Sequence, residues 1–253
     1  MTRISVSALS LVVLLVAPVG AQDRGRMTKA DVERQIKELS NWGRWGKDDQ
    51  LGALNLITPQ KRIEAAMLVK KGVSVSMFRD VVKQEAADNP SPFEHRMLNY
   101  GRGTDGQWAS DNYSVNYHGF AHTHMDSLCH LFYKGRMYNG FSREQVGPDG
   151  AEVLMISNAR SGIFTRGILF DIPMLKGVRF LEPGTAIYPE DLDAWEKFAK
   201  VKVRPGDVVF IRTGRWARRA IAGPWSGRKR WCRRTACILC GMAPQTGYRD
   251  AGE

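Results

Sequence analysis

The chain has 253 residues, of which 43% are hydrophobic and 25% are charged. These proportions are ordinary for a globular protein and exclude a disordered or collagen-like chain. A chain of this length can form one domain with a full core. The net charge of +11 lies largely in the arginine-rich residues 212–234. We interpret that region as solvated rather than as an RNA-binding surface, and we expect no nucleic-acid partner.

Residues 1–21 have the pattern of a secretory signal peptide. Arg3 precedes an apolar run, and Val19, Gly20 and Ala21 provide small residues for cleavage. The run is shorter than the roughly 20 residues that a membrane-spanning helix needs. We therefore expect cleavage after Ala21 and a mature protein that is exported, periplasmic or secreted, and not embedded in a membrane.

The N-terminal third predicts two helices separated by a loop. Thr28 is a suitable N-cap for residues 28–39, whose apolar side chains recur at helical spacing. Residues 42–52 mix glycine, tryptophan and charge without a period, which indicates an ordered loop. A second helix begins at Pro59, a favoured first helical residue, and closes at Gly72.

Strands and a further helix are expected beyond Gly72. Residues 73–78 and 113–117 alternate as strands do, whereas residues 88–111 accumulate proline, glycine and asparagine and predict a long loop. A strand, a helix and a buried strand then follow in order: 162–172, 189–200 and 208–211. This alternation predicts an α/β fold.

Four of the five histidines lie within a short segment that also contains Asp126: His118, His122, His124 and His130. Imidazole nitrogens and a carboxylate are the donors expected of a zinc, manganese or iron site. The spacing suits either a helix or a strand, and Gly119 favours a strand that enters a loop or helix near Asp126. We interpret Cys129 as small core filler rather than as a nucleophile. The fifth histidine, His95, is left outside the site.

The segment HMDSLCHLF, residues 124–132, resembles the signature of the metal-dependent cyclase family, which includes kynurenine formamidases and isatin hydrolases. That signature reads His-x-Gly-Thr-His-x-Asp-x-Pro-x-His. Its threonine, second histidine, aspartate and last histidine fall on Thr123, His124, Asp126 and His130.

The first histidine of the signature falls on Phe120, so one metal ligand is displaced. His122 or His118 could supply the missing nitrogen, and we prefer His122 because it lies nearer His124 in sequence. The resemblance thus implies His122, His124 and Asp126 as metal ligands. It implies His130 as the catalytic base, with a role as a further ligand left open.

The resemblance covers residues 42–225 loosely and implies a single swivelling α/β domain, extending over residues 28–224, in a homodimer. The implied reaction is hydrolysis of an amide, with an aryl-formamide or a cyclic amide as the small-molecule substrate and Zn²⁺ or Mn²⁺ as the cofactor. A divalent cation in such a site polarises a carbonyl and acidifies water, while an imidazole transfers protons near neutral pH.

The basic segment 225–253 departs from this pattern. It follows neither a helical nor a strand period, and no histidine occurs after His130, although the family places further ligands near its C-terminus. Our hypothesis is that a frameshift has replaced and truncated the native C-terminal part, leaving the fold incomplete there. Two alternatives to the enzyme follow: an inactive member that binds metal or ligand without turnover, and a basic protein that binds anionic polymers.

Overall fold

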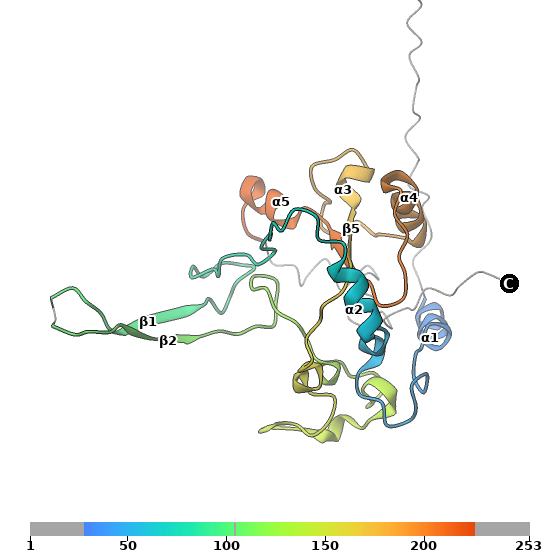
Figure 1. Cartoon of the computed structure of the whole chain (residues 1–253), viewed down its shortest axis with the longest axis horizontal. Coiled ribbons are helices and arrows are strands. Elements are labelled where there is room, and N and C mark those ends of the chain that lie inside the picture. Colours follow the sequence, from blue (N-terminus) through green and yellow to red (C-terminus); the bar gives the residue numbers. More distant parts are fainter. Residues whose placement is uncertain (1–27, 104, 226–253) are drawn as a thin grey trace, which may run out of the picture.

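The computed structural model describes residues 28–103 and 105–225. The expected signal peptide at 1–21 lies outside the described residues, as does the basic tail apart from Trp225. In the described part, helices alternate with short sheets around a parallel strand pair (Figure 1). This confirms the predicted α/β class. Within it, no helix has the length and apolar character that crossing a bilayer requires.

The parallel pair joins β5 (Gly167–Asp171) to β6 (Val208–Arg212), with Gly167 opposite Val208 and Asp171 opposite Arg212. Between them the chain forms α3 (Ile172–Leu175) and α4 (Pro189–Ala199). A β-strand followed by a helical crossover to a parallel strand is the unit that the alternating pattern predicted.

The main core lies where these helices cover β5. Its buried members are Ile168, Phe170, Ile172 and Trp195. The indole Nε1–H of Trp195 on α4 donates to the carbonyl of Leu169, 2.7 Å away, so the helix is both packed against and hydrogen-bonded to the strand. The sequence predicts a buried strand at residues 208–211, but β6 is half-buried at best, with Val209 and Ile211 exposed.

Capping residues fix the start of both N-terminal helices. Thr28 caps α1 (Lys29–Glu38): its hydroxyl accepts from the backbone N–H of Asp31, whose carboxylate accepts from Thr28 in return. Thr58 caps α2 (Pro59–Ala66), which has proline at its first position. Both helices are confirmed, although α2 ends six residues before the predicted Gly72 and continues only as turns.

Two expectations about strands are wrong. Residues 73–78 belong to no helix or strand and join no sheet in the described part of the chain, and Val73 and Val75 are 74% and 80% exposed. The predicted loop 88–111 instead contains most of a hairpin, β1 (Glu94–Asn99) paired antiparallel with β2 (Ser110–Ser114). Figure 1 shows this hairpin projecting away from the rest of the chain. Alternating apolar residues do not by themselves place a segment in a sheet, because a strand also needs a partner strand with which to form hydrogen bonds.

The remaining helical and strand elements are short. They are α5 (Arg215–Ala222), β3 (Val146–Gly147), β4 (Gly150–Ala151) and the 3₁₀ helices η1 (Gly52–Leu56), η2 (Leu128–His130), η3 (Tyr138–Gly140), η4 (Arg143–Gln145) and η5 (Ile156–Ala159). Cys129, Met137 and Leu154 form a second buried cluster beneath η2 and η3. The burial of Cys129 confirms its predicted role as core filler.

The predicted loop 42–52 is ordered because one side chain bridges several of its backbone groups. Asn139 accepts from the N–H of Gly43 at 2.7 Å and donates to the carbonyls of Gly46, Lys47 and Asp49 at 2.9–3.1 Å. Its φ of 59° lies in the left-handed region, which asparagine tolerates better than most residues. The loop is therefore held against η3 by this amide together with the hydroxyl of Tyr138, which donates to Asp49 at 2.8 Å.

We expect Asn139→Ala to lower the free energy of unfolding by about 2–4 kcal/mol, because it removes several hydrogen bonds of about 0.5–1.5 kcal/mol each and strains the left-handed backbone. Urea denaturation monitored by circular dichroism measures the loss. Asn139→Gly is the matched control. Glycine adopts this φ without strain, so this variant should recover the part of the loss that comes from backbone strain and not the part that comes from the hydrogen bonds. Equal stability of Asn139→Ala and the unaltered chain would contradict this account.

Candidate metal centre

The histidine-rich segment leaves the hairpin at the end of β2 and crosses an irregular stretch before η2. The predicted strand therefore ends at Ser114, before the first of the clustered histidines. Gly119 follows His118 with a φ of +146°, a backbone conformation that side chains other than glycine rarely adopt. At the other end, the burial of Cys129 anchors η2, and His130 is its last residue.

Three imidazoles converge on one oxygen of Asp126. Its Oδ1 lies 3.0 Å from Nδ1 of His118, 3.4 Å from Nδ1 of His130 and 3.6 Å from Nε2 of His124. The rings of His118 and His130 meet edge to face with their centroids 4.6 Å apart. The structure thus brings together residues that are up to twelve positions apart in sequence.

The donor geometry fits a divalent cation. Ligand atoms of His118, Asp126 and His130 all lie within 4.8 Å of one another, so one ion could contact all three. His118, Asp126 and His130 are exposed, whereas the side chain of His124 is 19% exposed. Nitrogen donors together with a carboxylate suit zinc or manganese better than calcium or magnesium, which prefer oxygen ligands.

The tautomer of His124 is set by the backbone. Its Nδ1 lies 2.9 Å from the carbonyl oxygen of His122, an acceptor that requires the proton to be on Nδ1. The other nitrogen, Nε2, then keeps its lone pair on the side of Asp126. A carbonyl that orients a histidine in this way is a common outer contact of metal ligands.

His122, the ligand preferred from sequence, is placed differently from the other three. Its side chain is buried, with 9% of the residue exposed, and neither ring nitrogen has a hydrogen-bond partner among the described residues. A buried imidazole without partners is costly and often marks a position where something binds. The structure therefore brings His118, His124 and His130 to Asp126 and leaves His122 apart from that cluster.

The remaining histidine belongs to the hairpin. Nε2 of His95 on β1 lies 2.9 Å from Oδ2 of Asp111 on β2, and its Nδ1 lies 3.4 Å from Nζ of Lys83. The contact with Asp111 links the two strands of the hairpin, whereas the contact with Lys83 ties β1 to the segment that precedes it. The contacts of His95 thus lie outside the cluster around Asp126.

Helix α5 lies against the segment that carries the cluster. The guanidinium of Arg215 is 5.1 Å from the ring centroid of Phe120 and donates to Asp88 at 3.1 Å. Arg219, one turn later, also donates to Asp88, and this hydrogen bond raises its pKa. The sequence predicts that this arginine-rich region is solvated, but two of its arginines bind Asp88, a buried carboxylate.

Comparisons with known proteins found a family model and solved structures that this chain resembles. Residues 62–247 match the Cyclase family model, whose description reads "Putative cyclase", so the match extends into the basic tail. The chain is also similar to a solved structure described as a novel cyclase, with 32% identity and a TM-score of 0.64 over 70% of this chain. The chain spans 63% of the length of that protein. No curated protein matches the sequence at a significant level.

Proposed function

The chain belongs to the cyclase family, and from that premise we propose that it is a metal-dependent hydrolase of an amide bond, acting on an aryl-formamide or a cyclic amide. The observation that carries this proposal is the convergence of three imidazoles on the carboxylate of Asp126. Zn²⁺ or Mn²⁺ is the proposed cofactor, because the donor set combines nitrogen with carboxylate oxygen.

The ligands are proposed to come from the cluster. Nitrogens of His118 and His124 both face Oδ1 of Asp126, at 3.0 Å and 3.6 Å, and the orphaned nitrogens of His122 make it the other candidate for the displaced histidine ligand. When bound there, a divalent cation would polarise the amide carbonyl and lower the pKa of water.

His130 is proposed to move the proton. Its Nδ1 faces Oδ1 of Asp126, and this contact orients the ring so that Nε2 can accept a proton. In the hydrolysis, the oxygen of water forms a bond to the carbonyl carbon and the carbon–nitrogen bond breaks. The proton held on Nε2 then passes to the leaving nitrogen, so that a formamide yields formate and an amine.

We also propose a class of substrate, a location and an oligomeric state for this enzyme. Its partner is a small-molecule amide rather than a nucleic acid, and the leader at residues 1–21 would direct it out of the cytoplasm. A homodimer is the proposed assembly.

The test is a joint measurement of metal content and hydrolysis on the purified chain. We expect about one Zn²⁺ or Mn²⁺ per chain and cleavage of formanilide, a simple aryl-formamide, that a chelator abolishes and added metal restores. His130→Ala should retain the metal and lose about 10²–10⁴-fold in rate, the usual contribution of a proton-transfer group.

Two results would contradict this function. If metal binds but neither formanilide nor a cyclic amide is cleaved, the chain is a member of the family that binds metal without turnover. If no metal binds, the histidine cluster is not a metal centre and the proposal fails.

A further inference from the structure

Arg215, the first residue of helix α5, joins this helix to the histidine-bearing segment. Its guanidinium lies among three aromatic rings, with the centroids of Trp225, Phe120 and Trp216 at 4.4, 5.1 and 5.7 Å. Rings within about 6 Å of a guanidinium attract it through their π faces. The Nε of Arg215 is buried and has no hydrogen-bond partner in the part of the chain that the structure describes, so the rings hold this side of the group.

The other side of the guanidinium is fixed by a buried carboxylate. Its Nη2 donates to Oδ2 of Asp88 at 3.1 Å, and the side chains of Arg215 and Asp88 are 21% and 1% exposed. Asp88 also accepts two hydrogen bonds from Arg219, one turn further along α5. Ion pairs withdrawn from water are screened little by salt, and their hydrogen bonds are charge-assisted. Phe120 therefore rests against a cation whose orientation is defined.

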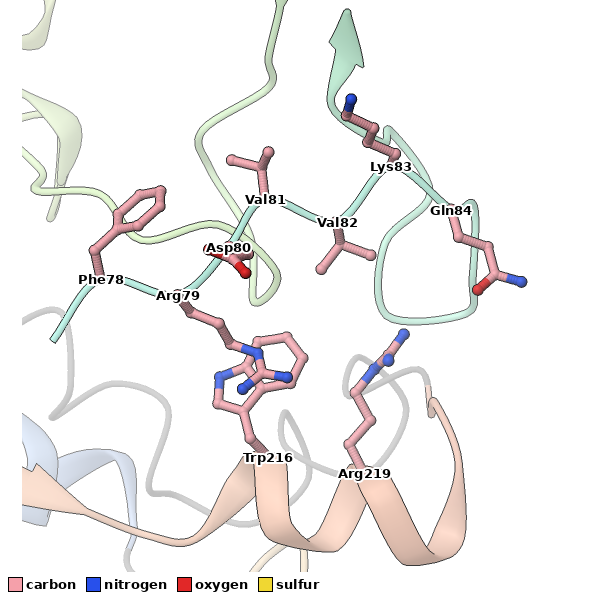
Figure 2. Close-up of a pocket in the computed structure, with 9 residues that line it drawn as sticks. All are labelled: Phe78, Arg79, Asp80, Val81, Val82, Lys83, Gln84, Trp216 and Arg219. Carbon is pink, nitrogen blue, oxygen red and sulfur yellow. The ribbon is translucent and has the colours of Figure 1, made fainter. Parts of the chain in front are cut away.

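A second contact ties the same segment to α5 three residues after Phe120. The Oγ1 of Thr123 accepts from the backbone N–H of Arg79 at 3.4 Å, and the guanidinium of Arg79 lies 4.1 Å from the ring centroid of Trp216. Figure 2 shows Arg79 reaching toward Trp216 at the cavity between residues 78–84 and α5. A hydrogen bond of this length is weak, so the contact with Phe120 is the main one.

The segment held in this way includes the turn that brings His118 to Asp126. Gly119, which separates His118 from Phe120, has a φ of +146°, a conformation that residues other than glycine rarely adopt. Two residues beyond Phe120, His122 is buried, with 9% of the residue exposed. A displacement of Phe120 would therefore move both of these histidines, including His118, whose Nδ1 lies 3.0 Å from Oδ1 of Asp126.

We propose that Arg215 is a positioning residue of the metal centre: it holds Phe120 in place and thereby keeps His118 in contact with Asp126. This inference rests on the proposed function and assigns to the arginine-rich helix a role in metal binding. Outer contacts that orient metal ligands commonly contribute about 10–100-fold to metal affinity. Because Arg215 acts through Phe120 rather than on a ligand directly, we expect the lower end of this range.

The test is the zinc affinity of the full chain, measured by competition with a chromophoric chelator. We expect Arg215→Gln to weaken zinc binding about tenfold. Phe120→Leu, which keeps an apolar side chain but removes the ring, should weaken it by a similar factor. Arg215→Lys keeps a positive charge that can pair with Asp88 and face the ring, so it should recover part of the affinity.

Arg218→Gln is the matched control on the same helix. The side chain of Arg218 is 18% exposed, against 21% for Arg215, and it donates to Glu182 at 2.8 Å. Its ring contact is with Trp225, at 4.7 Å, rather than with Phe120. Both substitutions remove a cation and an ion pair from α5, but Arg218→Gln should leave zinc affinity unaltered. Equal losses in the two variants would mean that general charge or helix stability determines the affinity, and would overturn the proposal.

Imidazole signals in NMR spectra of the metal-free chain give a readout that depends on neither metal nor turnover. Arg215→Gln should shift the signals of His118 and His122 and leave that of His95, on the hairpin, unchanged, whereas Arg218→Gln should shift none of them. If the unaltered chain binds no zinc but these shifts occur, the proposed function fails and the positioning of His118 stands. If zinc binds and Arg215→Gln weakens it no more than Arg218→Gln does, the positioning role is wrong and the proposed function stands. A loss of affinity without these shifts would also overturn the role, because Arg215 would then not act through His118.

Discussion

Replacing Asp126 with asparagine should weaken Zn²⁺ binding on the order of a hundredfold or more. Three imidazole nitrogens lie within 3.0–3.6 Å of Oδ1 of this residue, so it is the central donor of the cluster. Complete zinc sites bind with about 10–16 kcal/mol in total, and one of four ligands thus accounts for several kcal/mol. Competition with a chromophoric chelator measures the change in affinity.

Asp111→Asn is the matched control for this substitution. Asp111 also pairs with a histidine, His95, and its side chain is as exposed as that of Asp126, at 54% against 53%. The same chemical change at the hairpin should leave zinc affinity unaltered. Equal losses in the two variants would show that the affinity reflects general charge rather than the cluster.

The displaced ligand can be assigned by comparing His118→Ala with His122→Ala. The contact of His118 with Asp126 predicts a loss as large as that of Asp126→Asn. His122 is separate from the cluster, and its substitution should cost less unless the cation draws its buried ring toward Asp126. A larger loss at His122 would support the ligand preferred from sequence.

Signals carried by a few neighbouring residues were sufficient to predict the helices. Thr28 and Pro59 begin helices α1 and α2 by hydrogen bonds and backbone angles that involve only the next turn. The strand at residues 73–78 was predicted by the same kind of local pattern, and it is not in a sheet. Its failure reflects the dependence of strands on a distant partner, which no local pattern supplies.

The metal-binding residues were predicted only in part, because nearness in sequence does not decide which side chains meet in the folded chain. Histidine clustering and the family signature identified His124, Asp126 and His130, all of which the structure brings together. Sequence proximity favoured His122 over His118, whereas the three-dimensional contact belongs to His118, beyond the turn at Gly119. The cavity beside Arg79 had no signal in the sequence, because its two walls are more than a hundred residues apart.

Asp207→Asn should lower the free energy of unfolding by about 3–5 kcal/mol, because it removes one partner of a buried set of ion pairs. The carboxylate is fully buried and joins three segments of the chain. It accepts from Nζ of Lys61 on α2 at 2.6 Å, from Nε of Arg166 before β5 at 3.0 Å, and from the N–H of Arg204 at 2.7 Å. Neutralising it leaves two partly buried cations without their counter-ion.

A tight turn at Gly206 precedes Asp207 and fixes the position of its backbone. Gly206 has a φ of +78°, and a Cβ at this position would lie 2.4 Å from the carbonyl oxygen of Leu56. The backbone therefore passes against η1, and the Asp207 side chain is fixed beside Lys61. Asp193→Asn, an exposed carboxylate on α4, is the matched control and should change stability by less than about 0.5 kcal/mol.

The same carboxylate predicts part of the acid sensitivity of the fold. Burial alone would raise the pKa of Asp207, but the hydrogen bonds from Arg166, Lys61 and the backbone outweigh it and hold the pKa below its ordinary value. A carboxyl with a lowered pKa in the folded state stabilises the fold above its unfolded pKa of about 3.9, and that stability is lost as pH falls further.

Urea denaturation between pH 7 and pH 3 should therefore show a smaller decline in the free energy of unfolding for Asp207→Asn than for the unaltered chain. Some decline should persist, because Glu196 also has a lowered pKa: burial raises it, but hydrogen bonds from Val203 and Lys202 prevail. Parallel curves for the two proteins would mean that Asp207 does not couple folding to protonation.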